Sequence, residues 1–155
     1  MRRSEREVRG KKEIERILEK CRVLRIGLWD GKEIYLVPLN FAYEFQGENL
    51  ILYIHSAKDG RKINVIRNHP NIGFETDWDG GVKESENACG TSYRYESIIG
   101  TGRAEIIENP EEKQNGLAKL MQRYTGRKDT FFGAMAANVA VIKITAQTLA
   151  AKRNE

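Results

Sequence analysis

The chain has 155 residues, of which 40% are hydrophobic and 31% charged, and its net charge is +4. This size and balance fit one soluble globular domain and exclude a collagen, a disordered tail and a small disulfide-rich secreted protein. No apolar run approaches the ~18 residues of a membrane span, and the charged N-terminus does not look like a secretory signal, so we expect a cytoplasmic protein that contacts no membrane.

The positive charge is concentrated near the N-terminus. Residues 1–25 contain ten Lys or Arg and five Glu, whereas residues 26–155 contain sixteen Lys or Arg and seventeen Asp or Glu. A nucleic-acid-binding protein is expected to carry its basic residues on a folded face, so this distribution disfavours nucleic acid as a partner. We interpret residues 1–10 as a flexible lead-in to a single domain that spans residues 1–155.

An amphipathic helix is predicted over residues 11–20. Ile14, Ile17, Leu18 and Cys21 recur at the spacing that places side chains on one helix face. We therefore expect Cys21 in the core. Cys21 and Cys89 are too far apart in the sequence to form a clustered zinc site, so we expect two reduced thiols and no metal.

Strands are predicted next, over residues 23–29, 34–45 and 50–55. The first is apolar with Arg25 interposed, and the second is rich in β-branched and aromatic residues. The last two are joined by a polar turn that indicates a hairpin. Pro38 lacks the backbone N–H that a strand ladder uses, so it indicates an edge strand or a bulge.

The middle of the chain is predicted to form a short helix over residues 61–67 and a strand over residues 71–77. A polar loop is expected over residues 79–90, followed by a long strand region over residues 93–108. Glycines inside that long strand indicate a bulge or a close approach to the backbone.

A further helix begins at Asn109-Pro110, with Asn as its cap and acidic residues in its first turn, and ends at Gly126. A final strand is predicted over residues 139–145. Mostly antiparallel strands with a few covering helices predict a mainly β protein, built as a small β-barrel rather than a doubly wound sheet.

The segment from His55 to Lys62 carries the clearest functional pattern. A strand ends, a small polar loop follows, and a helix begins with two cations. A helix N-terminus attracts anions, Gly60 lets a ligand approach the backbone, and Ser56, Arg61 and Lys62 add a hydroxyl and positive charge. The pattern indicates a phosphate cradle, although an ordinary solvated helix start would look the same.

Two other segments can likewise be interpreted either as ligand-binding or as purely structural. In Val37-Pro38-Leu39-Asn40-Phe41 the proline leaves backbone groups free for a ligand, or simply marks an edge strand. Residues 93–102 interleave aromatic, basic and small side chains, which suits either a surface that faces a planar ring or an ordinary packed strand.

Together, in this order, the three segments resemble the flavin-binding split barrels of the pyridoxamine-phosphate-oxidase-like superfamily, and within it the branch of the nitroimidazole-resistance proteins. The resemblance runs from about Ile14 to Ile144. It implies an FMN-binding split β-barrel, mainly β with a few covering helices, that holds FMN (FAD is possible) in a cleft between the two subunits of a homodimer.

The resemblance also implies roles for individual residues. His55 would lie near the flavin and is the candidate catalytic proton donor, since a histidine titrates near physiological pH. The partner subunit would also contribute contacts, for which we choose Trp78 and Tyr93 as candidates although neither is matched to a family motif. The implied cofactor-binding residues are Val37, Pro38, Leu39 and Asn40 along the isoalloxazine ring, His55, Ser56, Ala57, Gly60, Arg61 and Lys62 around the phosphate, and Ser97 at the ring or ribityl chain.

The implied activity is that of a flavin-dependent oxidoreductase. A reduced nicotinamide would donate electrons and a small molecule, such as a nitroaromatic compound, would accept them. The chain ends Leu-Ala-Ala-Lys-Arg-Asn-Glu, without the arginine and tryptophan pattern of true pyridoxamine-phosphate oxidases, so vitamin B6 oxidation is disfavoured. The alternatives are a flavin-binding or storage protein without turnover and, less favoured, a nucleic-acid-binding regulator.

Overall fold

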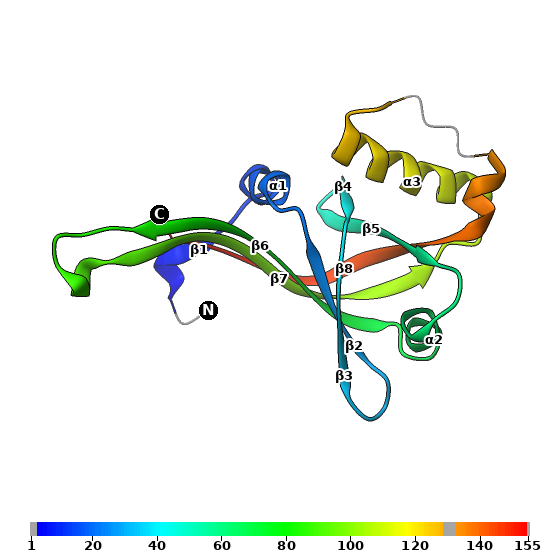
Figure 1. Ribbon diagram of the computed structural model, residues 1–155, viewed down its shortest axis with the longest axis horizontal. Coiled ribbons are helices and arrows are strands. Elements are labelled where there is room, and N and C mark those ends of the chain that lie inside the picture. The colour runs from blue at the N-terminus through cyan, green and yellow to red at the C-terminus, as the bar shows by residue number, and fades with distance from the viewer. Residues whose placement is uncertain (1–2, 129–132, 155) are drawn as a thin grey trace.

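One antiparallel sheet organises the structure, a computed structural model that describes residues 3–128 and 133–154 (Figure 1). Its strands are β1 (Glu7–Val8), β2 (Leu24–Trp29), β3 (Ile34–Leu39), β4 (Ala42–Gln46), β5 (Asn49–Ala57), β6 (Asn71–Lys83), β7 (Ser92–Ile106) and β8 (Val139–Asn154). The α-helices are α1 (Lys11–Lys20), α2 (Arg61–Asn68) and α3 (Pro110–Thr125), and short 3-10 turns span Ser4–Arg6, Ala88–Gly90 and Gly133–Asn138. None of the helices in these ranges is long and apolar enough to cross a membrane.

The strand order makes the sheet curl into a split barrel. The order is β3-β2-β6-β7-β8-β5-β4, with β1 paired to β8 outside this path. β3 and β4 therefore lie at opposite ends of the sheet, yet only Asn40 and Phe41 connect them along the chain. Since two residues span only ~7 Å, the two ends must meet. In the described residues no ladder joins these ends, so the barrel stays split on that side.

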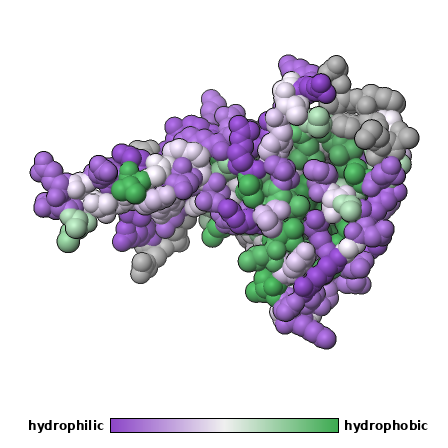
Figure 2. Space-filling model, in the orientation of Figure 1, coloured by the Kyte–Doolittle hydropathy of each residue, from purple (hydrophilic) through white to green (hydrophobic). Residues whose placement is uncertain are grey.

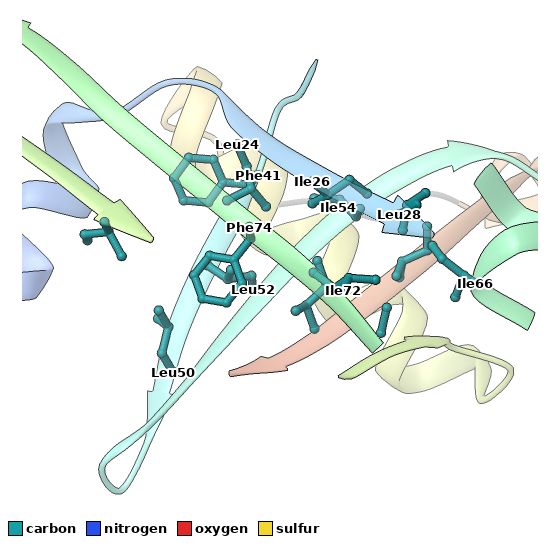
Figure 3. Close-up of a cluster of buried hydrophobic side chains, with 14 of the residues drawn as sticks. Leu24, Ile26, Leu28, Phe41, Leu50, Leu52, Ile54, Ile66, Ile72 and Phe74 are labelled. Carbon is teal, nitrogen blue, oxygen red and sulfur yellow. The ribbon is translucent and has the colours of Figure 1, made fainter. Parts of the chain in front are cut away.

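Apolar side chains fill the interior of this barrel (Figure 3). Leu24, Ile26 and Leu28 alternate along β2 with exposed or half-buried residues, which is the period of a strand with one buried face. Leu52 and Ile54 of β5 enter the same cluster. Each fully buried aliphatic side chain contributes roughly 1.5–3 kcal/mol. Because the interior is packed, a ligand has to bind at an edge or on the surface.

β5 is buried on both faces. Its other face, with Ile51 and Tyr53, packs with Leu117 and Leu120 of α3. Gly116 permits this contact, because a Cβ at that position would lie only 2.9 Å from Val141 Cγ1. This double burial explains why β5 reads as a continuous apolar run instead of an alternating one.

β6 and β7 extend beyond the barrel as a long arm, along which the C-terminal half of β8 and β1 also lie (Figure 1). The buried carboxylate of Glu96 fastens α1 to this arm. It accepts hydrogen bonds from Lys20 Nζ at 2.5 Å and from Arg153 Nε at 2.6 Å. Lys20 also lies over the ring of Trp78, 4.5 Å from its centroid.

Several predicted elements are confirmed. The first helix spans Lys11–Lys20 as expected, and the side chain of Asn109 caps α3 by accepting a hydrogen bond from the Glu112 N–H at 2.9 Å. Pro38 lies on the edge strand β3. The two predicted effects of glycine in the long strand both occur, since β7 shifts register between Thr101 and Gly102, and a Cβ on Gly100 would clash with Thr148 O at 2.3 Å.

Other predictions of strand limits are wrong. Residues 34–45 form two strands, β3 and β4, because the chain changes from one end of the sheet to the other at residue 40. The expected loop over residues 79–90 begins late, because β6 continues to Lys83 through a bulge at Gly80-Gly81. Likewise β8 continues past residue 145 to Asn154, paired with β7. Part of the expected flexible lead-in, Glu7–Val8, pairs with β8.

Candidate functional site

Two free strand edges flank one opening in the split barrel. β3 pairs only with β2, so its other edge carries no ladder in the described chain. β4 pairs with β5 only as far as Tyr53, whereas β8 pairs with β5 as far as Ala57. In the part of the chain that the structure describes, residues 54–57 therefore pair with a strand on one side only. Because β3 runs directly into β4, these two free edges begin at the same crossing and border the same opening.

Tyr124 of α3 holds the crossing in place. Its hydroxyl accepts a hydrogen bond from the Phe41 N–H at 3.1 Å and donates one to the carbonyl of Arg22 at 2.7 Å. The opening is thus fixed at its closed end by a helix, while its other end lies at the start of α2. The local sequence around residue 41 gives no sign of this contact, since Tyr124 is 83 positions away.

The predicted segments 37–40 and 55–57 both lie along the opening. Val37 and Leu39 are half-buried and pack against the barrel core, whereas Pro38 and Asn40 are exposed. On β5, Ser56 faces the same side as Leu52 and Ile54, and His55 faces the α3 side, because successive strand residues point to opposite faces. Ser56 and His55 therefore do not face the same side of β5.

The start of α2 offers unsatisfied backbone donors. No side chain caps it, and no acidic residue lies in its first turn. Gly60, at φ +131°, precedes the helix, and a Cβ there would have no neighbour within 4 Å. Free N–H groups, the positive end of the helix dipole and open space together suit an anion.

The two cations at the start of α2 have different surroundings. Arg61 is already paired: its Nη2 donates to Asp30 Oδ2 at 2.7 Å and to the carboxylate of Glu33, and its guanidinium stacks on the Tyr35 ring at 4.5 Å. Lys62 is half-buried and makes no hydrogen bond or ion pair within the described residues. Burial alone lowers the pKa of its ammonium group.

The hairpin between β2 and β3 supplies the partners of Arg61. Asp30 Oδ1 accepts hydrogen bonds from the N–H groups of Lys32 and Glu33, each at 3.0 Å. The Glu33 N–H and the Arg61 guanidinium hold the pKa of Asp30 well below its usual range. Asp30-Gly31 was predicted as a turn, but its contact with Arg61 depends on the tertiary fold and has no local signal in the sequence.

Ser97 and the two proposed partner-contact residues lie elsewhere. Ser97 is on β7, which β2 and β6 separate from β3. Trp78 lies under Lys20 on the arm, and the Tyr93 hydroxyl donates to Asp79 at 2.6 Å. Within one chain the structure does not bring these residues to the opening. Among the described residues, no group of His, Cys, Asp and Glu could hold a metal ion.

Comparisons with known proteins agree with this fold. A 5-nitroimidazole antibiotic resistance protein, as described for Bacteroides thetaiotaomicron, has 29% identity and a TM-score of 0.81, over 96% of this chain and 90% of its own. An FAD- and heme-binding protein from Mycobacterium smegmatis has 16% identity and a TM-score of 0.79, over 97% and 74%. An FAD-binding protein from Mesorhizobium loti has 19% identity and a TM-score of 0.66, over 95% and 96%.

The last two likenesses show the fold alone. A search of curated proteins found no match. A family model described as pyridoxamine 5'-phosphate oxidase matches residues 10–153, which is nearly the whole chain and includes both edges of the opening and the start of α2. The chain therefore belongs to the pyridoxamine 5'-phosphate oxidase family.

Proposed function

We propose that this protein is a flavin-binding oxidoreductase that holds its flavin along the opening between β3 and β5. One observation carries the proposal: among the described residues, a free strand edge leads directly to an uncapped helix start that carries a cation, Lys62, without a partner. The backbone of residues 37–40 would hydrogen-bond the polar edge of the isoalloxazine ring. The α2 N-terminus, Ser56 and Lys62 would hold the phosphate.

Within this proposal Arg61 differs from Lys62. A phosphate that approached Arg61 would also meet Asp30 and Glu33, two carboxylates against one guanidinium. We therefore propose that Lys62 supplies the charge that recognises phosphate. Arg61 holds the hairpin against α2 and so positions the beginning of β3, which forms one wall of the opening.

The surface next to the opening supports a homodimer. On the outer face of β2 and β3, Trp29 is 49% exposed, Ile34 71% and Leu36 69%, and Ile99 of β7 on the same face is 55% exposed. Figure 2 shows apolar residues gathered over this hairpin, in contrast to the mostly polar arm. An exposed apolar patch of this kind marks an interaction surface. A second copy on this face would cover it and could bring Ser97 or the arm to the flavin.

The chemistry would come from the flavin, which supplies hydride transfer when bound. This chain would bind and orient it, and would leave room for a reduced nicotinamide donor and a small-molecule acceptor such as a nitroaromatic compound. His55 remains the candidate proton donor. Because it faces the α3 side of β5, this role requires the acceptor to bind on that side.

The visible absorbance spectrum tests flavin binding. We expect the purified protein, loaded with FMN or FAD and desalted, to retain a two-band flavin spectrum, and we expect Lys62→Ala to lose it with FMN. No retained flavin in the wild-type protein would refute the proposal. Oxidation of reduced nicotinamide by the loaded protein with a nitroaromatic acceptor then separates an oxidoreductase from a flavin-binding protein without turnover, and His55→Ala should slow this reaction without releasing flavin.

A further inference from the structure

Apart from the opening, a hollow of about 280 Å³ lies beside α2 and has no role in the proposed flavin site. Three cations from separate elements line it: Lys58 from the connection after β5, Arg67 from α2 and Lys113 from α3. Arg67 and Lys62 are five positions apart on α2, which turns them to well-separated sides of the helix. The hollow and the proposed phosphate cradle therefore lie on different sides of α2.

The three cations have no partners in the part of the chain that the structure describes. Within the described residues, none of their side chains makes an ion pair, a hydrogen bond or a ring contact. Three unpaired positive groups from distant parts of the sequence, converging on one hollow, indicate a site for an anionic ligand.

The other residues that line the hollow indicate which class of anionic ligand fits it. Asp59 and Glu108 also reach the hollow, so its net charge is only +1, which is weak for a simple polyanion. Carboxylates that accept hydrogen bonds from sugar hydroxyls are a recurring feature of nucleotide sites. Ile106, Val139 and Ala140 add an apolar wall on which a planar base can pack. Cations, carboxylates and an apolar wall together match a nucleoside phosphate.

We infer that this hollow binds the adenosine phosphate half of a dinucleotide whose other half lies in the opening. The inference rests on the proposed function, because it places a flavin or a nicotinamide at the opening. The volume is close to the lower limit of ~300–1,000 Å³ for ligand pockets, which suits one nucleotide and not a whole dinucleotide. The adenosine phosphate belongs either to FAD or to the reduced nicotinamide donor.

The test is the triple variant Lys58→Gln, Arg67→Gln, Lys113→Gln, compared with a control that loses the same charge at exposed positions elsewhere, Lys12→Gln, Arg127→Gln, Lys128→Gln. Binding of AMP, FMN and FAD to the flavin-free chain is measured by calorimetry. We expect the triple variant to lose AMP binding by at least tenfold and to bind FMN as the wild-type protein does, while the control binds all three normally.

The two sources of the adenosine phosphate give different results. If FAD supplies it, the ratio of FAD to FMN affinity falls about tenfold or more in the triple variant. If the donor supplies it, that ratio is unchanged, and the KM for reduced nicotinamide of the FMN-loaded protein rises by a similar factor. The inference is overturned if the wild-type chain binds no AMP, or if neither quantity changes. A wild-type chain that binds AMP but no flavin would refute the proposed function and leave this hollow as a nucleotide site.

Discussion

Replacing Lys62 by alanine should weaken FMN binding and leave riboflavin binding nearly unchanged. Riboflavin lacks only the phosphate of FMN, so the ratio of the two affinities isolates the phosphate contacts. Lys62 is half-buried, has no partner among the described residues and lies at the uncapped start of α2. A hydrogen bond to a charged group is worth ~1.5–3 kcal/mol. The dissociation constant for FMN should therefore rise roughly 10- to 100-fold.

Arg61→Ala should behave differently, because Arg61 is already paired with Asp30 and Glu33 and its side chain is 44% exposed. Exposed ion pairs contribute about 0–1 kcal/mol, so loosening the hairpin should weaken FMN and riboflavin equally, by a factor of about five or less. Quenching of flavin fluorescence on titration with the flavin-free protein measures the affinities of the wild-type protein and of both variants for FMN and for riboflavin.

The double variant Asp30→Asn, Glu33→Gln decides the role of Arg61. If Arg61 positions the hairpin, removing both carboxylates should resemble Arg61→Ala. If Arg61 is a phosphate ligand that the carboxylates restrain, their removal should tighten FMN binding. The roles assigned to Arg61 and Lys62 are refuted if the double variant binds FMN more tightly, if Arg61→Ala weakens the binding of FMN alone, or if Lys62→Ala leaves the ratio of FMN to riboflavin affinity unchanged.

Three further outcomes can be checked independently of flavin. Leu36→Glu, at 69% exposure on the apolar outer face, should convert a dimer into a monomer in sedimentation experiments without lowering the melting temperature of the monomer; an unchanged dimer would exclude this face. Glu96→Gln should lower the free energy of unfolding by about 2 kcal/mol at pH 7. Burial raises the pKa of Glu96, but hydrogen bonds from Lys20 and Arg153 outweigh this effect, so the pKa is lowered in the folded protein. The stabilisation by the Glu96 carboxylate is therefore present above about pH 4 and is lost as the pH falls further. Urea unfolding should show a smaller difference in stability between the wild-type protein and the variant at pH 3 than at pH 7. Burial raises the pKa of Cys21 to about 11, whereas Cys89 is exposed. A thiol reagent at pH 8 should therefore modify one cysteine in the folded protein and two in urea. A second fast-reacting thiol in the folded protein would contradict the burial of Cys21.

Elements with local signals could be predicted from the sequence. The Asn109 cap, the Gly126 stop and the stripe of α1 each depend on residues within a few positions of one another, and all three are found. Pro38 indicated either an edge strand or a bulge, because a missing N–H is a property of the residue itself, and the sheet order shows that β3 is an edge strand. The family resemblance rested on segments of this kind and agrees with the family match.

Features that depend on long-range pairing could not be predicted in this way. Gly80-Gly81 looked like the start of a loop, but β6 pairs with β7 both before and after these two residues, so they form a bulge within the strand. The partners of Arg61 come from a hairpin about 30 positions earlier, and the tyrosine that holds Phe41 comes from α3. Local composition carries no information about such contacts, so the motif could group Arg61 with Lys62 although their surroundings differ.

The position of β8 in the sheet has a consequence for how the protein is made. β8 lies between β7 and β5, yet the ribosome synthesises it after every other strand. Until it emerges, the nascent chain can form only two partial sheets, β3-β2-β6-β7 and β5-β4, each with an unpaired edge where β8 belongs. Unpaired edges are where chains aggregate or exchange strands. The yield of soluble protein in the cell should therefore depend on translation speed and chaperone supply until β8 has been synthesised, more than on the stability of the finished barrel.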